Sequence, residues 1–464
     1  QMSECLLDSY FLIAPFLSWK EQLFTANLCK AIRDLLPQAI TKLELSFDAL
    51  KGVNISNLLE KYWRLDILVI YNSVLAQSNP KFVELVLALE TKPKHLTLFK
   101  LEGCEFPDEQ PLERMFTALG DLPRLKNLVI AGKNEENTSL NAITAFKNVI
   151  NSDNFRELST LNFSHNRTDM AMSTLISQIV QTKPQLVELT MEGMAMGSEL
   201  SLFEPMLGSM NSLEKFSVAS NGLHLEGAQV LQRIFSYDHS ALVELNISSN
   251  WLTVAGVSAL KFSLPRLGGL RILDVSRNKL GEQGGLVLAE VLPNCLKLEV
   301  LRCADNQLKS SVVPITAGLT SLSRLEELNL AVNLIGPENS VDFSAQLMLL
   351  PALKNLNILQ NRLASGFYDI ASVLSNSRLE RLEARSNKCD DWGLKRLGQN
   401  LGSLTHLDLS MNDFSYKAME EFLISAQASK LQKLNLKLQT SVGKSERERL
   451  KLLVPGQSKI LTRI

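Results

Sequence analysis

The chain is poor in the residue types from which catalytic and metal sites are usually built. Only five of its 464 residues are histidine and six are cysteine. No two cysteines form a CxxC pair or stand at the spacing of a zinc site, and no histidine belongs to an HExxH motif. The sequence also has no P-loop, no GxGxxG turn after a strand and no paired-carboxylate motif. We therefore expect a protein that is not an enzyme and that needs no cofactor or metal.

An excess of charge and a long apolar run are also missing. The formal net charge is −1, so no overall basic field favours nucleic acid or a membrane surface as the partner. No run of 18 apolar residues predicts a membrane span. The six cysteines are scattered, which is typical of buried thiols in a reducing compartment. These absences favour a cytoplasmic protein with protein partners.

What the sequence does contain is a repeat. Residues 242–252, "LVELNISSNWL", follow the frame LxxLxLxxNxL, in which the second and third apolar positions are Leu245 and Ile247. The copies lie about 28 residues apart, and the first ones are the least regular. The fifteen copies begin at residues 40, 65, 96, 125, 158, 186, 213, 242, 270, 298, 325, 353, 379, 404 and 431. Self-similarity at such a period is the signature of a solenoid.

The spacing has a physical reason. Leu245 and Ile247 alternate on a short strand and point into the core. Asn250 ends the strand, and its amide is expected to bond backbone groups of the neighbouring turn that a tight coil would leave bare. From the seventh copy to the fourteenth this ladder position is always asparagine: Asn221, Asn250, Asn278, Asn306, Asn333, Asn361, Asn387 and Asn412. Earlier copies carry Asp48, Ser73, Cys104, Lys133, Asn166 and Met194 there.

This array resembles the leucine-rich-repeat proteins of the ribonuclease-inhibitor-like class. The resemblance implies an α/β fold, a right-handed β/α solenoid with a parallel sheet on the concave face and helices on the convex face. We expect a helical N-terminal cap over residues 1–39, about fifteen repeats over 40–440 and a C-terminal cap over 441–464, where "SKILTRI" predicts a last strand. The polar stretch "GKNEENTSL", residues 132–140, predicts a protruding loop that is either tolerated or an additional contact.

In this class, partners usually bind the concave face and the loops that follow the strands. With the first residue of each copy numbered zero, offsets two, four and six face out of the strand. In the C-terminal repeats, Arg381, Arg385, His406, Lys433 and Lys437 gather there with Glu383 and Asp408, and either bind an acidic segment or form a self-neutralised face.

Other candidates lie along the same face and its rim. The set Glu244, Asn246 and Arg302 belongs to the polar middle of the array, whose residues are also the repeat's default choices. Tyr71 belongs to an apolar group with Ile67, Val69, Leu98 and Val129, which is either a docking patch or the seat of the N-terminal cap. On the rim, Trp251 is either an interface anchor or packed against a neighbouring loop.

We therefore predict an intracellular protein-interaction scaffold that binds a protein partner on its concave face and rim loops. The array with its helical start, "YFLIAPFLSW", loosely resembles the repeat domain of CARMIL and tropomodulin-type actin regulators, which favours a part in a regulator of the actin cytoskeleton. Two alternatives stay open. One is a RanGAP-like GTPase activator that acts through Arg167 or Arg277, and the other is a pathogen effector that mimics host repeats.

Overall fold

The computed structural model describes residues 41–50, 53–61, 64–91, 94–132, 140–151, 153–439, 441–452 and 461–463. It comprises two compact units, residues 1–221 and 222–464. The predicted cap over residues 1–39 lies outside the described residues, and so does most of the predicted loop, since 133–139 are not described. In each unit a strand and a helix alternate along the chain, as the repeat predicts. The first unit is called unit 1 and the second unit 2 below.

Unit 1 contains seven described strands, and each pairs in parallel with the next one along the sequence where both belong to this unit. The strands are β1 (Lys42–Leu45), β2 (Ile67–Tyr71), β3 (Leu98–Glu102), β4 (Asn127–Ala131), β5 (Thr160–Asn162), β6 (Glu188–Thr190) and β7 (Lys215–Ser217). The described α-helices are α4 (Ile55–Lys61), α5 (Pro80–Thr91), α6 (Gln110–Gly120), α7 (Leu140–Val149), α8 (Met170–Gln181) and α9 (Glu204–Leu207).

Unit 2 repeats the same arrangement, again with parallel neighbours in sequence order. Its strands are β8 (Glu244–Asn246), β9 (Ile272–Asp274), β10 (Val300–Arg302), β11 (Glu327–Asn329), β12 (Asn355–Asn357), β13 (Arg381–Glu383), β14 (His406–Asp408), β15 (Lys433–Asn435) and β16 (Leu461–Arg463). Its α-helices are α10 (His224–Ile234), α11 (Thr253–Ala259), α12 (Gly281–Val291), α13 (Val312–Leu319), α14 (Ser340–Leu347), α15 (Phe367–Val373), α16 (Asp391–Gln399), α17 (Tyr416–Ala426) and α18 (Lys444–Leu452).

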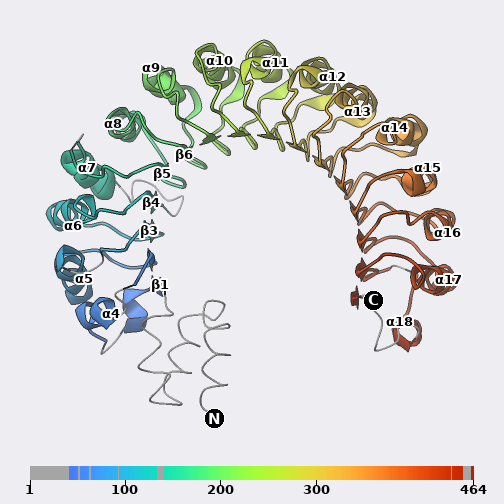
Figure 1. The fold of residues 1–464 in the computed structure, drawn as a ribbon, viewed down its shortest axis with the longest axis horizontal. Helices are drawn as coiled ribbons and strands as arrows, with labels where there is room; N and C mark the ends of the chain where they lie inside the picture. The colour runs from blue at the N-terminus through green and yellow to red at the C-terminus, as the bar shows by residue number, and fades with distance from the viewer. Residues whose placement is uncertain are drawn as a thin grey trace. The chain divides into compact units, whose positions relative to one another are not determined.

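The strands begin where the repeat frame places them. Strands β1 to β15 all start at offset two of the fifteen copies, and the residues at offset three are buried. The predicted last strand is present as β16, which pairs with β15. Within each unit taken by itself, Figure 1 shows the strands on the inner side of a bend and the helices on its outer side. The α/β solenoid fold is therefore confirmed, and the face of the sheet that the helices leave uncovered is called the open face.

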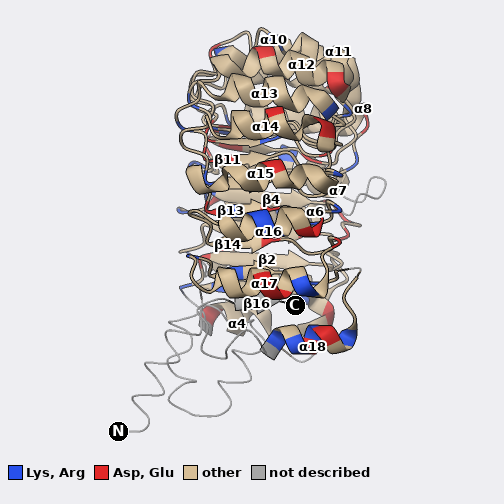
Figure 2. Ribbon diagram, turned by 90° about the vertical axis from the view of Figure 1, so that its right-hand side faces the viewer, with Lys and Arg blue, Asp and Glu red and all other residues tan. Residues whose placement is uncertain are grey.

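Leucine repeats and helix stripes together form the core. In the repeat that opens unit 2's sheet, Leu242, Leu245 and Ile247 have almost no exposed surface, because α11 covers the strand. Gly256 of α11 lies against Leu252 and the carbonyl of His224, where a Cβ atom would be too close. In contrast to these buried residues, Figure 2 shows that α18 carries both acidic and basic residues along its length. Such a helix faces solvent along most of its length.

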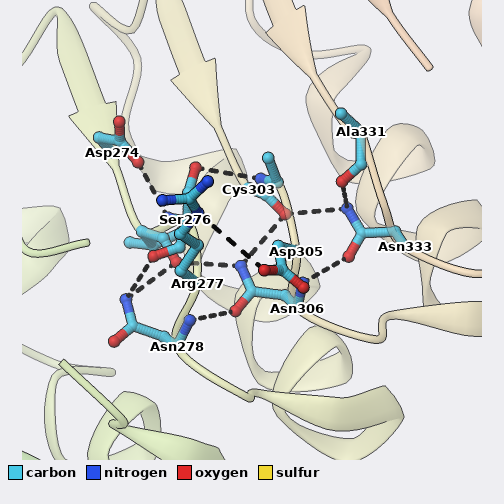
Figure 3. Close-up of polar contacts among 11 residues, drawn as sticks. Asp274, Ser276, Arg277, Asn278, Cys303, Asp305, Asn306, Ala331 and Asn333 are labelled. Atoms are coloured by element: carbon cyan, nitrogen blue, oxygen red, sulfur yellow. Dashed lines mark hydrogen bonds and ion pairs between the residues drawn. The ribbon is translucent and has the colours of Figure 1, made fainter. Parts of the chain in front are cut away.

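The asparagine ladder is present in unit 2 and works as the sequence predicts (Figure 3). The amide nitrogen of Asn306 donates to the carbonyls of Val275, at 3.0 Å, and Cys303, at 3.1 Å. Its Oδ1 accepts the backbone N–H of Asn278 at 2.8 Å, and its own N–H donates to Asn333 Oδ1 at 2.9 Å. Each asparagine therefore ties its own turn to both neighbouring turns, and all the groups involved are buried.

Some repeats hold the same position with a side chain other than asparagine. In unit 1 the thiol of Cys104 donates to the carbonyls of Ile70, at 3.4 Å, and Glu102, at 3.7 Å. In unit 2 Gln439 continues the ladder, because its Nε2 donates to the carbonyls of Leu409 and Leu436. Its Oε1 accepts the N–H of Asn412 at 3.2 Å. The consensus asparagine did not predict the glutamine, although its spacing from Asn412 matches the repeat.

Candidate interaction surface

The open face of unit 2 presents two columns of side chains. In the strands from β8 to β12 the middle residue is buried and the first and third are half-buried, so offsets two and four point away from the core. This alternation is what a sheet covered on one side requires. The predicted candidates Glu244, Asn246, Arg302, Arg381, His406 and Lys433 all lie on these two columns.

Most side chains in the column at offset four form hydrogen bonds with the backbone of their own repeat. Its Asn and Asp side chains accept the backbone N–H two residues further on, which closes the turn after each strand. Asn246 accepts from Ser248 at 3.1 Å, and Asp274 accepts from Ser276 at 2.9 Å. The same bond recurs at Asn329, Asn357, Asp408 and Asn435. Asn246 therefore closes the turn of its own repeat, and its position in the repeat frame did not predict this structural role.

The column at offset two changes its charge along unit 2. It carries Glu244 in β8 and Glu327 in β11, and then the basic or titratable side chains Arg381, His406 and Lys433 in β13, β14 and β15. Arg302, at offset four of β10, forms an ion pair with Glu327 in which Nε and Nη2 both lie 3.1 Å from Oε1. A partner that used this Arg302 guanidinium would first have to separate it from its glutamate.

A hollow of about 320 Å³ lies in the open face over β13, β14 and β15. It is lined by Arg381, Leu382, Glu383, His406, Leu407, Asp408, Lys433, Leu434 and Asn435. The leucines are the buried middle residues of the three strands, so the side chains that border the hollow are those of the charged and polar residues, with their aliphatic parts included. The parallel register sets Arg381 beside His406 and His406 beside Lys433. The three residues, called the cation row below, thus stand together as predicted for this cluster.

The two carboxylates of the hollow receive their hydrogen bonds from neutral donors. Asp408 accepts from Asn435 Nδ2 at 2.9 Å and from Ser410 Oγ at 2.6 Å. Glu383 accepts from Asn357 Nδ2 at 2.7 Å. Loss of hydration raises the pKa of Glu383, and the negative charges of Asp408 and Glu327 raise it further, against a smaller lowering by Arg381. The two carboxylates are therefore hydrogen-bonded by neutral groups rather than by the neighbouring basic side chains.

The cation row has no acidic partner at contact distance. Among the described residues, no carboxylate lies within ion-pair distance of Arg381, His406 or Lys433. The Nδ1 atom of His406 lies 2.9 Å from Thr405 Oγ1. Loss of hydration lowers the pKa of His406, and the positive charges of Arg381 and Lys433 lower it further, while Glu380 opposes them. The imidazole is therefore mostly neutral at pH 7.

Two further cations stand beside the hollow at offset six. Arg385 directs its guanidinium to the Met411 thioether, with Nη2 2.9 Å and Nε 3.1 Å from Sδ. Lys437 is exposed on the next repeat but one. The acids of the hollow consequently lie between basic residues on both sides, and the cluster as a whole is positive. The prediction of a self-neutralised face does not account for this excess.

Trp251 lies on the rim of unit 2, in the loop after β8. Its indole is 52% exposed, although the ring meets His224 edge-on at 5.4 Å between centroids. The ammonium of Lys279, from the next repeat, sits 4.4 Å above the indole ring. The residue therefore packs against its neighbours and still offers a large apolar surface. Trp392, at the start of α16, is 71% exposed.

The apolar group predicted in unit 1 lies on the open face of β2, β3 and β4. Val69 is buried, whereas Ile67, Tyr71, Leu98 and Val129 are half-buried. In register, Val69 stands between Glu44 and Lys100. These belong to two local ion pairs, Lys42 with Glu44 at 2.6 Å and Lys100 with Glu102 at 2.7 Å. Tyr71 is thus one edge of a small apolar strip bordered by charges.

The two arginines of the GTPase-activator alternative lie in different units. Arg277, in the loop after β9, is 72% exposed and has Nε 4.0 Å from Asp305 Oδ2 (Figure 3). Arg167 is exposed in the loop after β5. Within the described residues, no group of three or more His, Cys, Asp or Glu side chains is placed to hold a metal ion. The helices described here include none of the length and apolarity that a membrane span requires.

Comparison with known proteins gives a family match in unit 2. The family described as "Leucine Rich repeat" matches residues 240–261, 270–289 and 403–423. The chain is also 29% identical over 201 residues to ribonuclease inhibitor of Sus scrofa, which is 42% of this chain and 44% of that protein. It is 26% identical over 200 residues to NACHT, LRR and PYD domains-containing protein 4C of Mus musculus, 42% of this chain and 20% of that protein.

A third relative is Tonsoku-like protein of Bos taurus, 30% identical over 169 residues, which are 36% of this chain and 11% of that protein. The chain spans less than half the length of each of these relatives. Proteins built from leucine-rich repeats generally mediate protein–protein interaction. The regular strand starts, the asparagine ladder and these matches together show that the chain contains leucine-rich repeats similar to those of ribonuclease inhibitor.

Proposed function

We propose that this chain is an interaction scaffold that binds a protein partner on the open face of unit 2, over β13, β14 and β15. The observation that carries the proposal is the cation row, whose charges line a hollow without a carboxylate at contact distance among the described residues. Charged groups left in this way on a sheet face favour a complementary surface on another molecule. The rim around Trp251 supplies a second contact of the kind that anchors interfaces.

The backbone under this surface supports a binding role. The turns that follow β13 and β14 are tied by Asn387 and Asn412, both completely buried, and by Gln439 in the next repeat. A surface held in this way loses little conformational freedom when a partner binds, so less of the interaction energy is spent on ordering. Such a rigid array is therefore well suited to binding a partner without catalysing a reaction.

The proposed location is the cytoplasm. In the described part of the chain, Cys295, Cys303 and Cys389 are free and buried, and Cys104 is also buried. Burial raises the pKa of the Cys295 thiol to about 11, which keeps it protonated and unreactive. Thiols of this kind persist in a reducing compartment.

A place in a regulator of the actin cytoskeleton is a narrower form of the same proposal. It rests on the loose resemblance of the N-terminal segment to CARMIL and tropomodulin-type regulators. Co-sedimentation of the full chain with filamentous actin, alone and with capping protein, tests it directly. Absence of the chain from both pellets would contradict the proposed part in actin regulation and would leave the scaffold proposal unchanged.

The central experiment compares partners bound by the full chain with those bound by charge-reversed variants. Arg381→Glu with Lys433→Glu reverses the two ends of the cation row. The matched control, Lys395→Glu with Lys417→Glu, makes the same charge change on exposed positions of α16 and α17, in the repeats that carry β13 and β14. We expect proteins purified with the wild-type chain to be lost from the first variant and kept by the control.

Identical partners from the wild type and from the cation-row variant would contradict the proposal. Thermal unfolding by circular dichroism, with equal midpoints for the two variants, shows that any loss is not caused by misfolding. The same purified chain, added to a panel of small GTPases, tests the GTPase-activator alternative. Faster hydrolysis that disappears in Arg277→Ala or Arg167→Ala would replace the scaffold proposal.

A further inference from the structure

The cation row differs from the rest of the open face in how its charges are satisfied. Elsewhere on this face, cations meet acids directly, as Arg302 meets Glu327 in unit 2 and Lys100 meets Glu102 in unit 1. In the hollow over β13, β14 and β15, both acids instead accept from asparagine and serine. Among the described residues, the basic groups of the row have no carboxylate at ion-pair distance, although the acids stand only one column away.

We infer that the cation row is the seat of an acidic peptide segment of the partner, whose Asp and Glu carboxylates bind Arg381 and Lys433. The inference rests on the proposed function and adds the chemistry of the partner. Charge complementarity carries it, since the four cations Arg381, Arg385, Lys433 and Lys437 surround only two carboxylates. The hollow admits side chains of carboxylate size and its rim is basic on both sides.

The spacing of the row suits an extended peptide. Neighbouring strands lie about 4.8 Å apart, so Arg381 and Lys433, two strands apart, are separated by roughly 10 Å at the backbone. An extended chain advances about 3.3–3.6 Å per residue. Two acidic residues two or three positions apart therefore reach both ends of the row, with His406 between them.

The hollow suits carboxylates better than nucleic acid or a membrane. No Phe, Tyr or Trp side chain lines it, so bases would find only the small His406 imidazole for stacking. Glu383 and Asp408 form part of the lining and would repel the densely charged phosphates of a nucleic acid. The leucines of the lining are buried, so no apolar side chain is offered to lipid. A segment with a few separated carboxylates needs no stacking or apolar surface, and it can place its charges at Arg381 and Lys433 rather than against these two acids.

His406 gives this seat a dependence on pH. The imidazole stands between Arg381 and Lys433, with Glu380 at the start of β13 and with Glu383 and Asp408 in the neighbouring column. The neighbouring cations lower its pKa, and a bound carboxylate would raise it again. Binding of an acidic segment therefore takes up protons and strengthens as the pH falls toward the imidazole's pKa. Protonation of Glu383 would act in the same direction, because its pKa is raised.

The test uses the full chain and a fluorescein-labelled octaglutamate peptide, with octaglutamine as the uncharged control, followed by fluorescence anisotropy at low salt. We expect binding of octaglutamate that weakens about tenfold or more in Arg381→Gln with Lys433→Gln, which is ~1.4 kcal/mol. The control Lys395→Gln with Lys417→Gln leaves the Kd unchanged. His406→Gln removes most of the strengthening between pH 7.5 and pH 5.5.

Three outcomes would overturn the inference. They are no binding of octaglutamate, equal binding by the cation-row variant, and tighter binding of octauridylate or of phosphatidylserine vesicles that is lost in the same variant. None of these outcomes decides the proposed function, which depends on whether charge reversal removes protein partners. Partners lost on charge reversal while octaglutamate fails to bind would leave the scaffold proposal intact and assign other chemistry to its interface.

Discussion

The two units solve the same structural problem with different side chains. In unit 2 a buried amide ties each turn to the next, and every strand of β8 to β16 ends after three residues. In β2, β3 and β4 of unit 1 the ladder position is Ser73, Cys104 or the undescribed residue 133, and the strands run on to five residues. In these three repeats strand pairing continues further and satisfies more of the backbone groups, whereas β6, with Met194 at the ladder position, ends after three residues.

The cores differ in the same direction. Unit 1 gathers Phe116, Phe146, Phe155 and Phe163 into one cluster, in which the Phe146 ring lies 5.1 Å from Phe116 and 5.3 Å from Phe155. Unit 2 relies more on the leucines of its repeats and on the ladder between them. Irregular repeats thus leave larger and less uniform spaces, which aromatic side chains fill. In the repeat of Phe163 the aromatic cluster is combined with a ladder amide, because Asn166 Nδ2 donates to the carbonyls of Ile130 and Phe163. The aromatic core therefore supplements the polar ladder in holding neighbouring repeats together.

The largest expected effect breaks the ladder of unit 2. Replacing Asn306 with Ala removes three hydrogen bonds and leaves the Asn278 N–H and the carbonyls of Val275 and Cys303 with fewer partners in a buried turn. We expect the free energy of unfolding to fall by about 3 kcal/mol or more. Ser73→Ala, which removes the bond from the Phe47 N–H at 2.9 Å and the bond to the Tyr71 carbonyl at 2.9 Å, costs about 1–2 kcal/mol.

Urea unfolding followed by circular dichroism measures both variants in the full chain. The comparison between the units depends on the ratio of the two losses. If Ser73→Ala destabilised the chain as much as Asn306→Ala does, the polar ladder would be equally important in unit 1. Asn306→Asp is a second variant, which keeps an acceptor for Asn278 but replaces the donor with a buried carboxylate oxygen that faces the carbonyls of Val275 and Cys303.

A smaller effect is expected at Trp251, and it separates the two roles of that residue. Trp251 has φ 56°, a left-handed conformation that costs little only for glycine, and Gly222 holds the equivalent position one repeat earlier with φ 63°. In Trp251→Gly, relief of that strain offsets the lost contacts with Lys279 and His224. The unfolding free energy therefore changes by less than about 1 kcal/mol, while binding of a partner that uses the rim is reduced.

Differential scanning calorimetry and the partner purification described above provide the two readouts. A loss of stability of several kcal/mol without any change in partners would assign Trp251 to packing alone. Trp251→Phe is the conservative variant, and it should retain most of the partner binding.

The smallest expected effect is a change of stability with pH. His239 is buried beside Phe235, and its Nε2 has no hydrogen-bond partner. Burial lowers its pKa, against smaller opposing contributions from the Ile234 carbonyl and Asp238. Below about pH 6.5 the unfolded chain therefore binds a proton before the folded chain does, and the folded state loses stability as the pH falls.

The urea midpoint between pH 7 and pH 5 measures this effect, and His239→Gln should flatten its slope. Unit 1 supplies the contrast, since Lys183 is buried with Nζ 2.6 Å from the Asn154 carbonyl. Burial lowers the pKa of Lys183, so that its contribution appears only in the alkaline range. If the urea midpoint of His239→Gln kept the same slope with pH, the effect would have to come from other groups, such as His406.

The sequence predicts the fold closely because one physical rule is repeated. Leucines at offsets three and five must be buried, and this places the strands β1 to β15 correctly even where the frame is poor, as at Leu65 and Leu96. The ladder is predicted where asparagine holds the position and is missed at Gln439. A longer amide performs the same task there, because only the reach of the side chain differs.

The candidate surface is less predictable from the sequence, because its residues depend on their neighbours in space. The cluster around His406 follows from the register, and the structure places those residues together. That Arg302 is already paired with Glu327, and that Asn246 closes its own turn, depends on side-chain geometry that a repeat frame does not contain. The pattern of Asn or Asp followed two residues later by a small residue is the signal that would have revealed the second of these.

The ladder bond also makes the repeats of unit 2 interchangeable. Each asparagine accepts from the repeat before it and gives its own N–H to the repeat after it, so a repeat requires from one neighbour what it supplies to the other. Repeats with such matching ends are interchangeable blocks, and the chain can lengthen or shorten by a whole block while both new neighbours keep their bonds. A change of one residue within a strand has no such freedom, since it would turn the leucines outward.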